Sequence, residues 1–176
     1  NGRTALSLIK QLSPDIVVMD ISMPELNGME ATAQIIRDFP DTRVIALSTY
    51  TQDKYVRGML EAGACGYVSK ETASDELLNA IRRIRQGQKY LSSDVTPAVV
   101  EACINPSEQP SSVRSQLGNR EREVLQLIAE GKTSGEVASL LCVSTNTVDT
   151  HRRNIMRKLE LHSIAELTKY AIREGL

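Results

Sequence analysis

The chain has 176 residues, 41% of them hydrophobic, which suffices for one or two ordinary domains with apolar cores. Its formal net charge is −1, so any contact with nucleic acid must come from a local basic patch. The cysteines at positions 65, 103 and 142 never form a Cys-x-x-Cys pair, which disfavours a disulfide framework or a zinc site and indicates a reducing compartment. We find no long apolar run and no amino-terminal signal pattern, and therefore expect a cytoplasmic protein without membrane contact.

Residues 1–90 alternate between short β-branched runs and segments of helical period. The short runs cover residues 16–19, 44–47 and 66–69. Each run is apolar and too short for a helix, as expected for strands that are buried on both faces. The last helix of this region is expected to begin after Ser74 as its N-cap. The alternation predicts an α/β domain with a doubly wound parallel sheet of three strands.

The pattern changes after residue 90. Residues 94–104 show a short helical period, and residues 105–116 are rich in Pro and Ser, which predicts a linker. From Leu117 onward only helical periods occur, in four segments, and the second and third have the spacing of a helix-turn-helix. The N-caps of these helices are expected at Asn119, Ser134, Ser144 and Ser163. We therefore divide the chain into domains at 1–90 and 117–176, joined by a connecting helix and linker at 91–116.

The helix that follows Ser144 has a polar face suited to the major groove of DNA. At 100° per residue, Val148, Ile155 and Leu159 point to the small core, and hydrogen-bonding side chains lie on the other side. The candidates for contacts with bases are Asn146, Asp149, Thr150, Arg153 and Arg157. The candidates for contacts with phosphates are Thr147, Arg152 and Lys158. On this helix alone, an ordinary solvated face remains an open alternative.

Three functional groups follow or end the predicted strands of the first domain. Asp20 directly follows the first strand, Ser48 ends the second, and Lys70 ends the third. Parallel strands end at one edge of a sheet, so a carboxylate, a hydroxyl and an ammonium converge there. The set suits phosphoryl transfer to Asp20, with Lys70 and a metal ion neutralising the phosphoryl oxygens. The alternative is that Asp20 caps a loop and Lys70 is a surface charge.

The carboxy-terminal motifs resemble the LuxR-type helix-turn-helix of the NarL/FixJ response-regulator family. They read Asn119-Arg-Glu-Arg-Glu-Val-Leu-Gln-Leu-Ile-Ala-Glu-Gly131, Val143-Ser-Thr-Asn-Thr-Val-Asp-Thr-His151 and Ile155-Met-Arg-Lys-Leu159. The resemblance implies an all-α module of four helices, whose third helix reads double-stranded DNA and whose fourth pairs two copies into a homodimer. By position, it makes Asp149, Thr150 and Arg153 the base-reading residues. Some relatives carry lysine where this chain has Asp149, so their target sequences cannot be transferred.

The amino-terminal motifs are similar to those of flavodoxin-like receiver domains. They read Asp20-Ile-Ser-Met-Pro-Glu-Leu-Asn-Gly28, Ala46-Leu-Ser48 and Gly63-Ala-Cys-Gly-Tyr-Val-Ser-Lys70. The resemblance implies that Asp20 is the phosphoacceptor, Ser48 the switch hydroxyl, Tyr67 the aromatic that moves with it, and Lys70 the phosphate partner. It also implies Mg2+, held by Asp20 and the backbone carbonyl of Ser22, and a sensor histidine kinase as a partner.

The sequence departs from that family at its start. Family receivers carry two adjacent acidic residues after their first strand, whereas the only acidic residue in positions 1–19 is Asp15. We therefore expect a fragment or a receiver without its first two strands, with an incomplete metal site and with residues 16–19 at a sheet edge.

The function that the resemblance implies is that of a non-enzymatic two-component transcription regulator, activated by phosphorylation of an aspartate. A phosphorylation-independent DNA-binding or scaffolding regulator is the alternative that the missing acidic pair favours. An aspartate-nucleophile phosphatase or transferase is a third hypothesis. Ser22 disfavours it, because such hydrolases usually have a second acid two residues after the nucleophile, and residues 1–104 contain no histidine.

Overall fold

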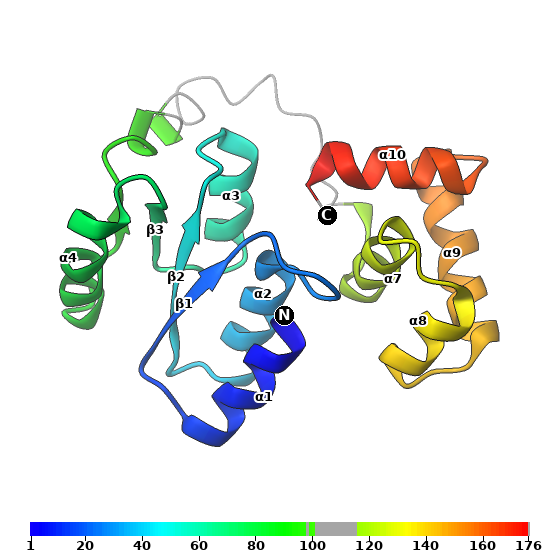
Figure 1. Cartoon of the computed structure of the whole chain (residues 1–176), viewed down its shortest axis with the longest axis horizontal. Helices are drawn as coiled ribbons and strands as arrows, with labels where there is room; N and C mark the ends of the chain where they lie inside the picture. Colours follow the sequence, from blue (N-terminus) through cyan, green and yellow to red (C-terminus); the bar gives the residue numbers. More distant parts are fainter. Residues whose placement is uncertain (98, 101–115, 176) are drawn as a thin grey trace. The chain divides into compact units, whose positions relative to one another are not determined.

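The computed structural model describes residues 1–97, 99–100 and 116–175 (Figure 1). The chain divides into two compact units, Asn1–Glu108 and Gln109–Leu176. Of the helix predicted at 94–104, residues 96–97 and 99–100 are helical, and the rest of its carboxy-terminal part lies outside the described residues, as does nearly all of the predicted linker. None of the helices that the structure describes is long and apolar enough to cross a membrane.

The first unit is a parallel sheet with crossover helices, as predicted. Its strands, in their order across the sheet, are β1 (Ile16–Asp20), β2 (Arg43–Ser48), β3 (Gly66–Ser69) and β4 (Tyr90–Leu91). Its helices are α1 (Gly2–Leu12), α2 (Gly28–Asp38), α3 (Asp53–Glu61) and α4 (Ala73–Arg85). The predicted number of three strands was wrong, because β4 has only two residues and shows no period of its own. β1 lies at one edge of the sheet that the structure describes.

Helices cover both faces of this sheet. Alternate side chains of a strand point to opposite faces. Val44 and Tyr67 therefore join the core cluster formed with α1, α2 and α3, whereas Ile45 and Val68 join the cluster formed with α4. The sheet residues of β2 and β3 are largely buried on both faces, which explains their continuous apolar runs. For β1 the prediction of burial on both faces was wrong, because this strand lies at the edge of the described sheet and its Val18 is 40% exposed.

Among residues 117–175, the second unit has four helices around one core of apolar side chains. They are α7 (Asn119–Ala129), α8 (Ser134–Leu141), α9 (Thr145–Leu159) and α10 (Ile164–Glu174) (Figure 1). Val124, Leu125 and Leu127 of α7 are buried, together with Ile155 of α9 and Leu167 of α10. The apolar side of α9 therefore packs against the core of the second unit.

The structure corrects three of the predicted N-caps. The cap of α7 is Gly118 rather than Asn119, because the Glu121 carboxylate accepts a hydrogen bond from the Gly118 N–H at 2.9 Å. The cap of α8 is Thr133 rather than Ser134, and the cap of α4 is Thr72 rather than Ser74. The caps predicted at Ser144 and Ser163 are confirmed, since both hydroxyls accept a hydrogen bond from the helix.

Candidate functional site

The carboxyl edge of the sheet brings the predicted residues of the first unit together. Asp20 is the last residue of β1, Ser48 is the last residue of β2, and Lys70 directly follows β3. The strand register pairs Asp20 with Leu47 and Ser48 with Ser69. The backbone N–H of Lys70 also donates to the Ser48 carbonyl at 2.8 Å, so β2 fixes where Lys70 leaves the sheet.

Lys70 contacts the carboxylate of Asp20 directly. Its Nζ lies 2.6 Å from Oδ2 of Asp20, and the two side chains are 39% and 35% exposed. The other carboxylate oxygen, Oδ1, accepts a hydrogen bond from the Ser22 N–H at 3.4 Å. The carboxylate is thus held by a cation and still reachable from solvent, which is what a nucleophile for an external electrophile requires.

Ser48 and Tyr67 are joined through the backbone of Tyr50. The Tyr50 N–H donates to the Ser48 hydroxyl at 3.1 Å, and the buried Tyr67 hydroxyl donates to the Tyr50 carbonyl. Burial raises the pKa of Tyr67 to about 12, which keeps its hydroxyl a donor. The Tyr50 ring stacks on that of Tyr55, with their centroids 4.4 Å apart. Our sequence reasoning missed Tyr50, whose contribution is made by its backbone.

The loop after Asp20 depends on a close backbone approach at Gly28. A Cβ atom at Gly28 would lie 1.9 Å from the carbonyl oxygen of Asp20 and 2.9 Å from Cα of Ile21. The Gly28 N–H donates to the Ile21 carbonyl at 2.9 Å, and the Asn27 side chain caps α2 through the Glu30 N–H at 3.0 Å. Glycine is therefore needed for the loop to return so close to Asp20.

The donors near Asp20 do not by themselves fit a magnesium ion. Mg2+ requires near-octahedral coordination by six oxygens, of which proteins usually supply one or two carboxylates. Among the described residues, no group of three His, Cys, Asp or Glu side chains is placed to hold a metal ion. Asp20 is the carboxylate that the sequence predicts for this metal, and Lys70 Nζ lies 2.6 Å from one of its oxygens.

The α9 face has the orientation predicted from its period. Val148 and Ile155 are buried, and Leu159 packs against the same core. The exposed residues of the opposite side include Asn146, Thr150, Arg153 and Arg157, whereas Lys158 is exposed on a flank of the helix, where it contacts α7. The predicted phosphate-contacting residues Thr147 and Arg152 are half-buried.

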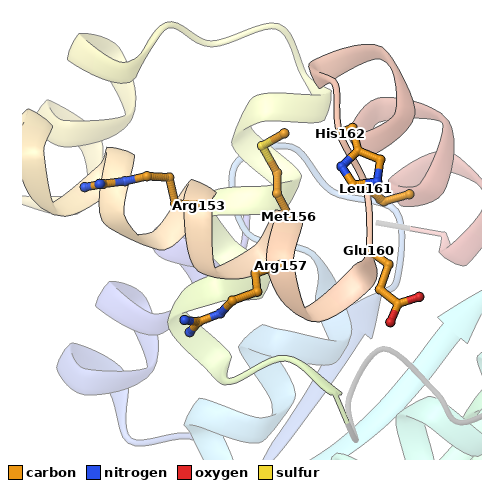
Figure 2. A pocket seen from close by; sticks show the side chains of 6 residues that line it. All are labelled: Arg153, Met156, Arg157, Glu160, Leu161 and His162. Atoms are coloured by element: carbon orange, nitrogen blue, oxygen red, sulfur yellow. The ribbon is translucent and has the colours of Figure 1, made fainter.

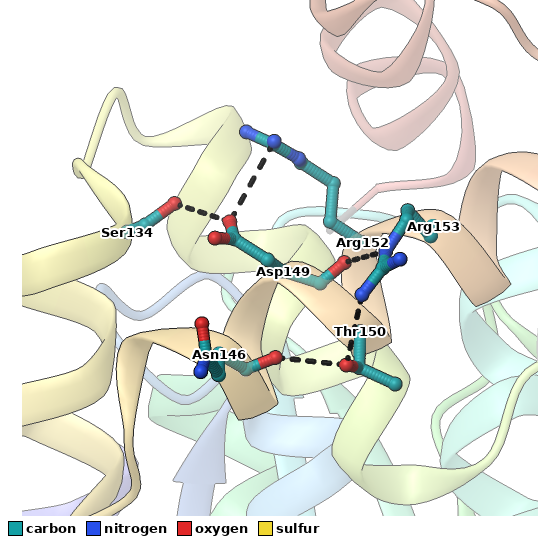
Figure 3. A network of polar contacts seen from close by, with 6 residues as sticks. All are labelled: Ser134, Asn146, Asp149, Thr150, Arg152 and Arg153. Atoms are coloured by element: carbon teal, nitrogen blue, oxygen red, sulfur yellow. Dashed lines mark hydrogen bonds and ion pairs between the residues drawn. The ribbon is translucent and has the colours of Figure 1, made fainter.

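Hydrogen bonds along α9 hold Arg153 close to its own helix (Figure 3). The Arg153 guanidinium donates through Nε to the Asp149 carbonyl and through a terminal nitrogen to the Thr150 hydroxyl, both at 3.3 Å. The Thr150 hydroxyl in turn donates to the Asn146 carbonyl at 2.8 Å. The guanidinium therefore lies along an exposed helix face, where its partners belong to α9 itself.

Lys158, a predicted phosphate-contacting residue, is bonded to a carboxylate of another helix. Its Nζ lies 2.6 Å from Oε2 of Glu121, the same oxygen that accepts from the Gly118 N–H. Burial alone would raise the pKa of Glu121, but the hydrogen bonds from Lys158 and Gly118 outweigh it and hold that pKa below its ordinary value. Lys158 thus ties α9 to the start of α7. Our sequence analysis found no signal for Glu121, because the two residues belong to different helices.

A pocket of about 580 Å³ lies beside the end of α9 (Figure 2). It is lined by Arg153, Met156, Arg157, Glu160, Leu161 and His162. Two of the exposed arginines of α9 therefore border a pocket with both polar and apolar walls, which the sequence did not predict.

Two family models match the chain, one for each unit. The model of the response regulator receiver domain matches residues 1–82, and that of the luxR family of bacterial regulatory proteins matches residues 115–171. The oxygen regulatory protein NreC of Staphylococcus carnosus is 35% identical over 100% of this chain and 83% of its own length. The response regulator UvrY of Escherichia coli K12 is 35% identical over 99% of this chain and 80% of its own length.

The chain belongs to the NarL/FixJ family of response regulators. It is a two-component transcriptional regulator with a receiver and a LuxR-type DNA-binding domain. This assignment disfavours the phosphorylation-independent alternative.

Solved structures of response regulators share the fold. One of the LuxR family from Aurantimonas sp. SI85-9A1 is 32% identical, with a TM-score of 0.57 over 59% of this chain and 74% of that chain. RcsB of Salmonella typhimurium has a TM-score of 0.62 over 100% of this chain and 82% of that chain, at 23% identity. The latter supports the fold alone.

Proposed function

We propose that this response regulator receives a phosphoryl group on Asp20 and that α9 reads the DNA it controls. The phosphorylation of Asp20 is supported by the 2.6 Å contact between Lys70 Nζ and Asp20 Oδ2 at the carboxyl edge of the sheet. An isolated surface ion pair would be of little consequence. This one instead puts a cation beside a half-exposed carboxylate at the edge where α/β sheets bind their ligands.

The proposed step is a phosphoryl transfer to the Asp20 carboxylate. A carboxylate oxygen of Asp20 forms a bond to the phosphorus of the donor, the bond between that phosphorus and the leaving group breaks, and the leaving group departs with the electron pair. The product is an acyl phosphate on Asp20. Lys70 then pairs with a phosphoryl oxygen instead of the carboxylate, and the charge developing on the transferred group is stabilised.

The proposed switch uses Ser48 and Tyr67. In the structure, the Ser48 hydroxyl accepts a hydrogen bond from the Tyr50 N–H. Once a phosphoryl oxygen lies near Asp20, the same hydroxyl can donate to that oxygen. Tyr50 carries the carbonyl that holds the Tyr67 hydroxyl, so movement of Ser48 is transmitted to the buried ring of Tyr67.

The proposed partners are a sensor histidine kinase, which supplies the phosphoryl group, and double-stranded DNA bound by two copies of the chain. For the reading of DNA we assign base contacts to Asn146, Asp149, Thr150, Arg153 and Arg157. We assign phosphate contacts to Thr147 and Arg152, with Lys158 contributing beside its bond to Glu121. We propose that the chain is not an enzyme that turns over a substrate, and that its chemistry is limited to its own phosphorylation.

Labelling of the 176-residue chain with radioactive acetyl phosphate tests the proposal. We expect an alkali-labile label that disappears in Asp20→Asn. Asp15→Asn is the matched control, because Asp15 is an exposed carboxylate directly before the same strand and should keep the label. A label that persists in Asp20→Asn, or an unlabelled wild-type chain, would contradict the assignment.

A further inference from the structure

Asp149 has one carboxylate oxygen held within the protein and the other open. Its Oδ1 accepts a hydrogen bond from the Ser134 hydroxyl at 3.0 Å and lies 3.6 Å from a terminal nitrogen of Arg152 (Figure 3). Its Oδ2 has no hydrogen bond or ion pair with any residue that the structure describes, and the side chain is 40% exposed. The exposed face of α9 thus presents a fixed acceptor between its arginines.

A carboxylate on this face does not strengthen sequence-independent binding to DNA. The phosphate backbone is negative, and binding that is independent of sequence comes from lysines and arginines. The neighbouring Arg152 offsets part of the repulsion by pairing with Oδ1. What the open oxygen can supply is acceptance of a hydrogen bond from a base edge.

The four bases differ in what they offer to such an acceptor in the major groove. Cytosine presents the N4 amino group as a donor, without an acceptor of its own in that groove. Adenine places the N7 acceptor beside its N6 donor, and guanine and thymine present acceptors. A carboxylate is repelled by acceptors, so cytosine fits it best.

We infer that Asp149 is a specificity-determining residue, which selects cytosine at one position of each half-site by accepting from N4 on Oδ2. Ser134, on the neighbouring helix α8, is its positioning residue, because its hydroxyl holds Oδ1 and fixes the direction of the carboxylate. Holding the side chain before binding reduces the conformational entropy lost on binding. The inference rests on the proposed reading of DNA by α9 and specifies one base in it.

Selection from a duplex library with randomised half-sites tests this inference on the full 176-residue chain. We expect cytosine at one position for the wild type, at least roughly tenfold preferred over other bases. In Asp149→Asn the selected base should change to adenine, because a carboxamide both accepts from N6 and donates to N7. Asp149→Ala should lose the preference at that position alone, and Ser134→Ala should weaken it several-fold.

The control is Glu160→Gln, which removes an exposed carboxylate at the carboxy-terminal cap of α9. It should change the affinity for all sequences by one common factor and leave every base preference intact. Sequence-selective binding in which both variants of Asp149 keep the wild-type base at every position would overturn the inference and leave the proposed function standing. A wild-type chain that binds no duplex, or binds all duplexes alike, would overturn both.

Discussion

The Lys70 ammonium lies 2.6 Å from Oδ2 of Asp20, across the carboxyl ends of β1 and β3, and both side chains are partly exposed. An exposed ion pair contributes only about 0–1 kcal/mol to stability. The contact is therefore better explained by chemistry at Asp20 than by stabilisation of the fold.

Replacement of Lys70 separates these two roles. Lys70→Ala should change the free energy of unfolding of the first unit by less than about 1 kcal/mol. It should slow the labelling of Asp20 roughly tenfold or more, because the cation that stabilises the transferred phosphoryl group is lost. Hydrogen exchange of the β2 amides measures the first quantity and acetyl phosphate labelling the second. Arg37→Ala, which removes the more exposed ion pair with Asp38, is the control and should leave labelling unchanged. Wild-type labelling in Lys70→Ala would contradict this role.

A second prediction concerns Gly28, because the backbone of Asp20 occupies the place that a Cβ atom would take at this residue. Gly28→Ala must displace the loop, and we expect a loss of about 1–3 kcal/mol or more in the stability of the first unit, with slower labelling of Asp20. The matched control is Gly135→Ala in α8, where the added carbon would meet no atom within 4 Å other than its chain neighbours and the nearby backbone of its own helix. That variant should change the stability of the second unit by less than about 1 kcal/mol, since Gly135 lies in the first turn of α8 and not in the helix interior. Equal stability of Gly28→Ala and the wild type would show that the loop has another low-energy path.

The elements with a clear period could be predicted from the sequence, and those without one could not. The strands at 16–19 and 44–47 and the orientation of α9 follow from apolar runs and from a 100° repeat. The strand at Tyr90–Leu91 is set by its pairing with Gly66 and Tyr67, which no local pattern reveals. The caps at Ser144 and Ser163 were predicted correctly, whereas three others were displaced by one or two positions, because neighbouring residues can cap a helix equally well.

The sequence predicts which functional residues lie at the carboxyl edge of the sheet, but it does not predict the contacts between their side chains. The ends of parallel strands share one edge, which brings Asp20, Ser48 and Lys70 together. Pairs between different helices, such as Ser134 with Asp149 and Glu121 with Lys158, depend on how the helices pack. Spacing along one helix contains no information about such partners.

Arg152 and Arg153 are adjacent, and we expect their replacements to affect DNA binding in different ways. Arg153→Ala should weaken binding to the selected site by about 1–3 kcal/mol and relax its specificity, because a guanidinium pairs with a base edge. Arg152→Ala should weaken binding to all sequences and lower the dependence of affinity on salt, with base preferences changed at most at the position read by its partner Asp149. Titrations of selected and scrambled duplexes at several salt concentrations measure both. Arg173→Ala, in α10, is a control for the loss of one positive charge. An unchanged discrimination between duplexes in Arg153→Ala would show that this arginine contacts phosphates instead.

Glu121 connects the stability of the second unit to pH. Hydrogen bonds from Lys158 and Gly118 hold the pKa of this carboxyl below its ordinary value, despite the opposing effect of burial. A carboxyl whose pKa is lowered by folding contributes stability above its ordinary pKa, and this contribution is lost as the pH falls through the lowered pKa. The second unit should therefore lose stability on acidification below about pH 5.

Glu121→Gln tests this linkage, because glutamine keeps the shape and an acceptor for the Gly118 N–H but has no charge. At neutral pH we expect a loss of about 1 kcal/mol, since the partly exposed Lys158 ammonium loses its charged partner but remains accessible to water. The further loss of stability between about pH 5 and pH 3 should be smaller than in the wild type, because the titrating group is gone. Hydrogen exchange of the α7 amides from Val124 to Ile128 measures both quantities in this unit alone. Lys158→Met removes the other partner and should likewise reduce the acid dependence, since the pKa of Glu121 then loses the cation that lowers it. If all three proteins lost stability with the same slope on acidification, the bond between Glu121 and Lys158 would not be the origin of the acid sensitivity.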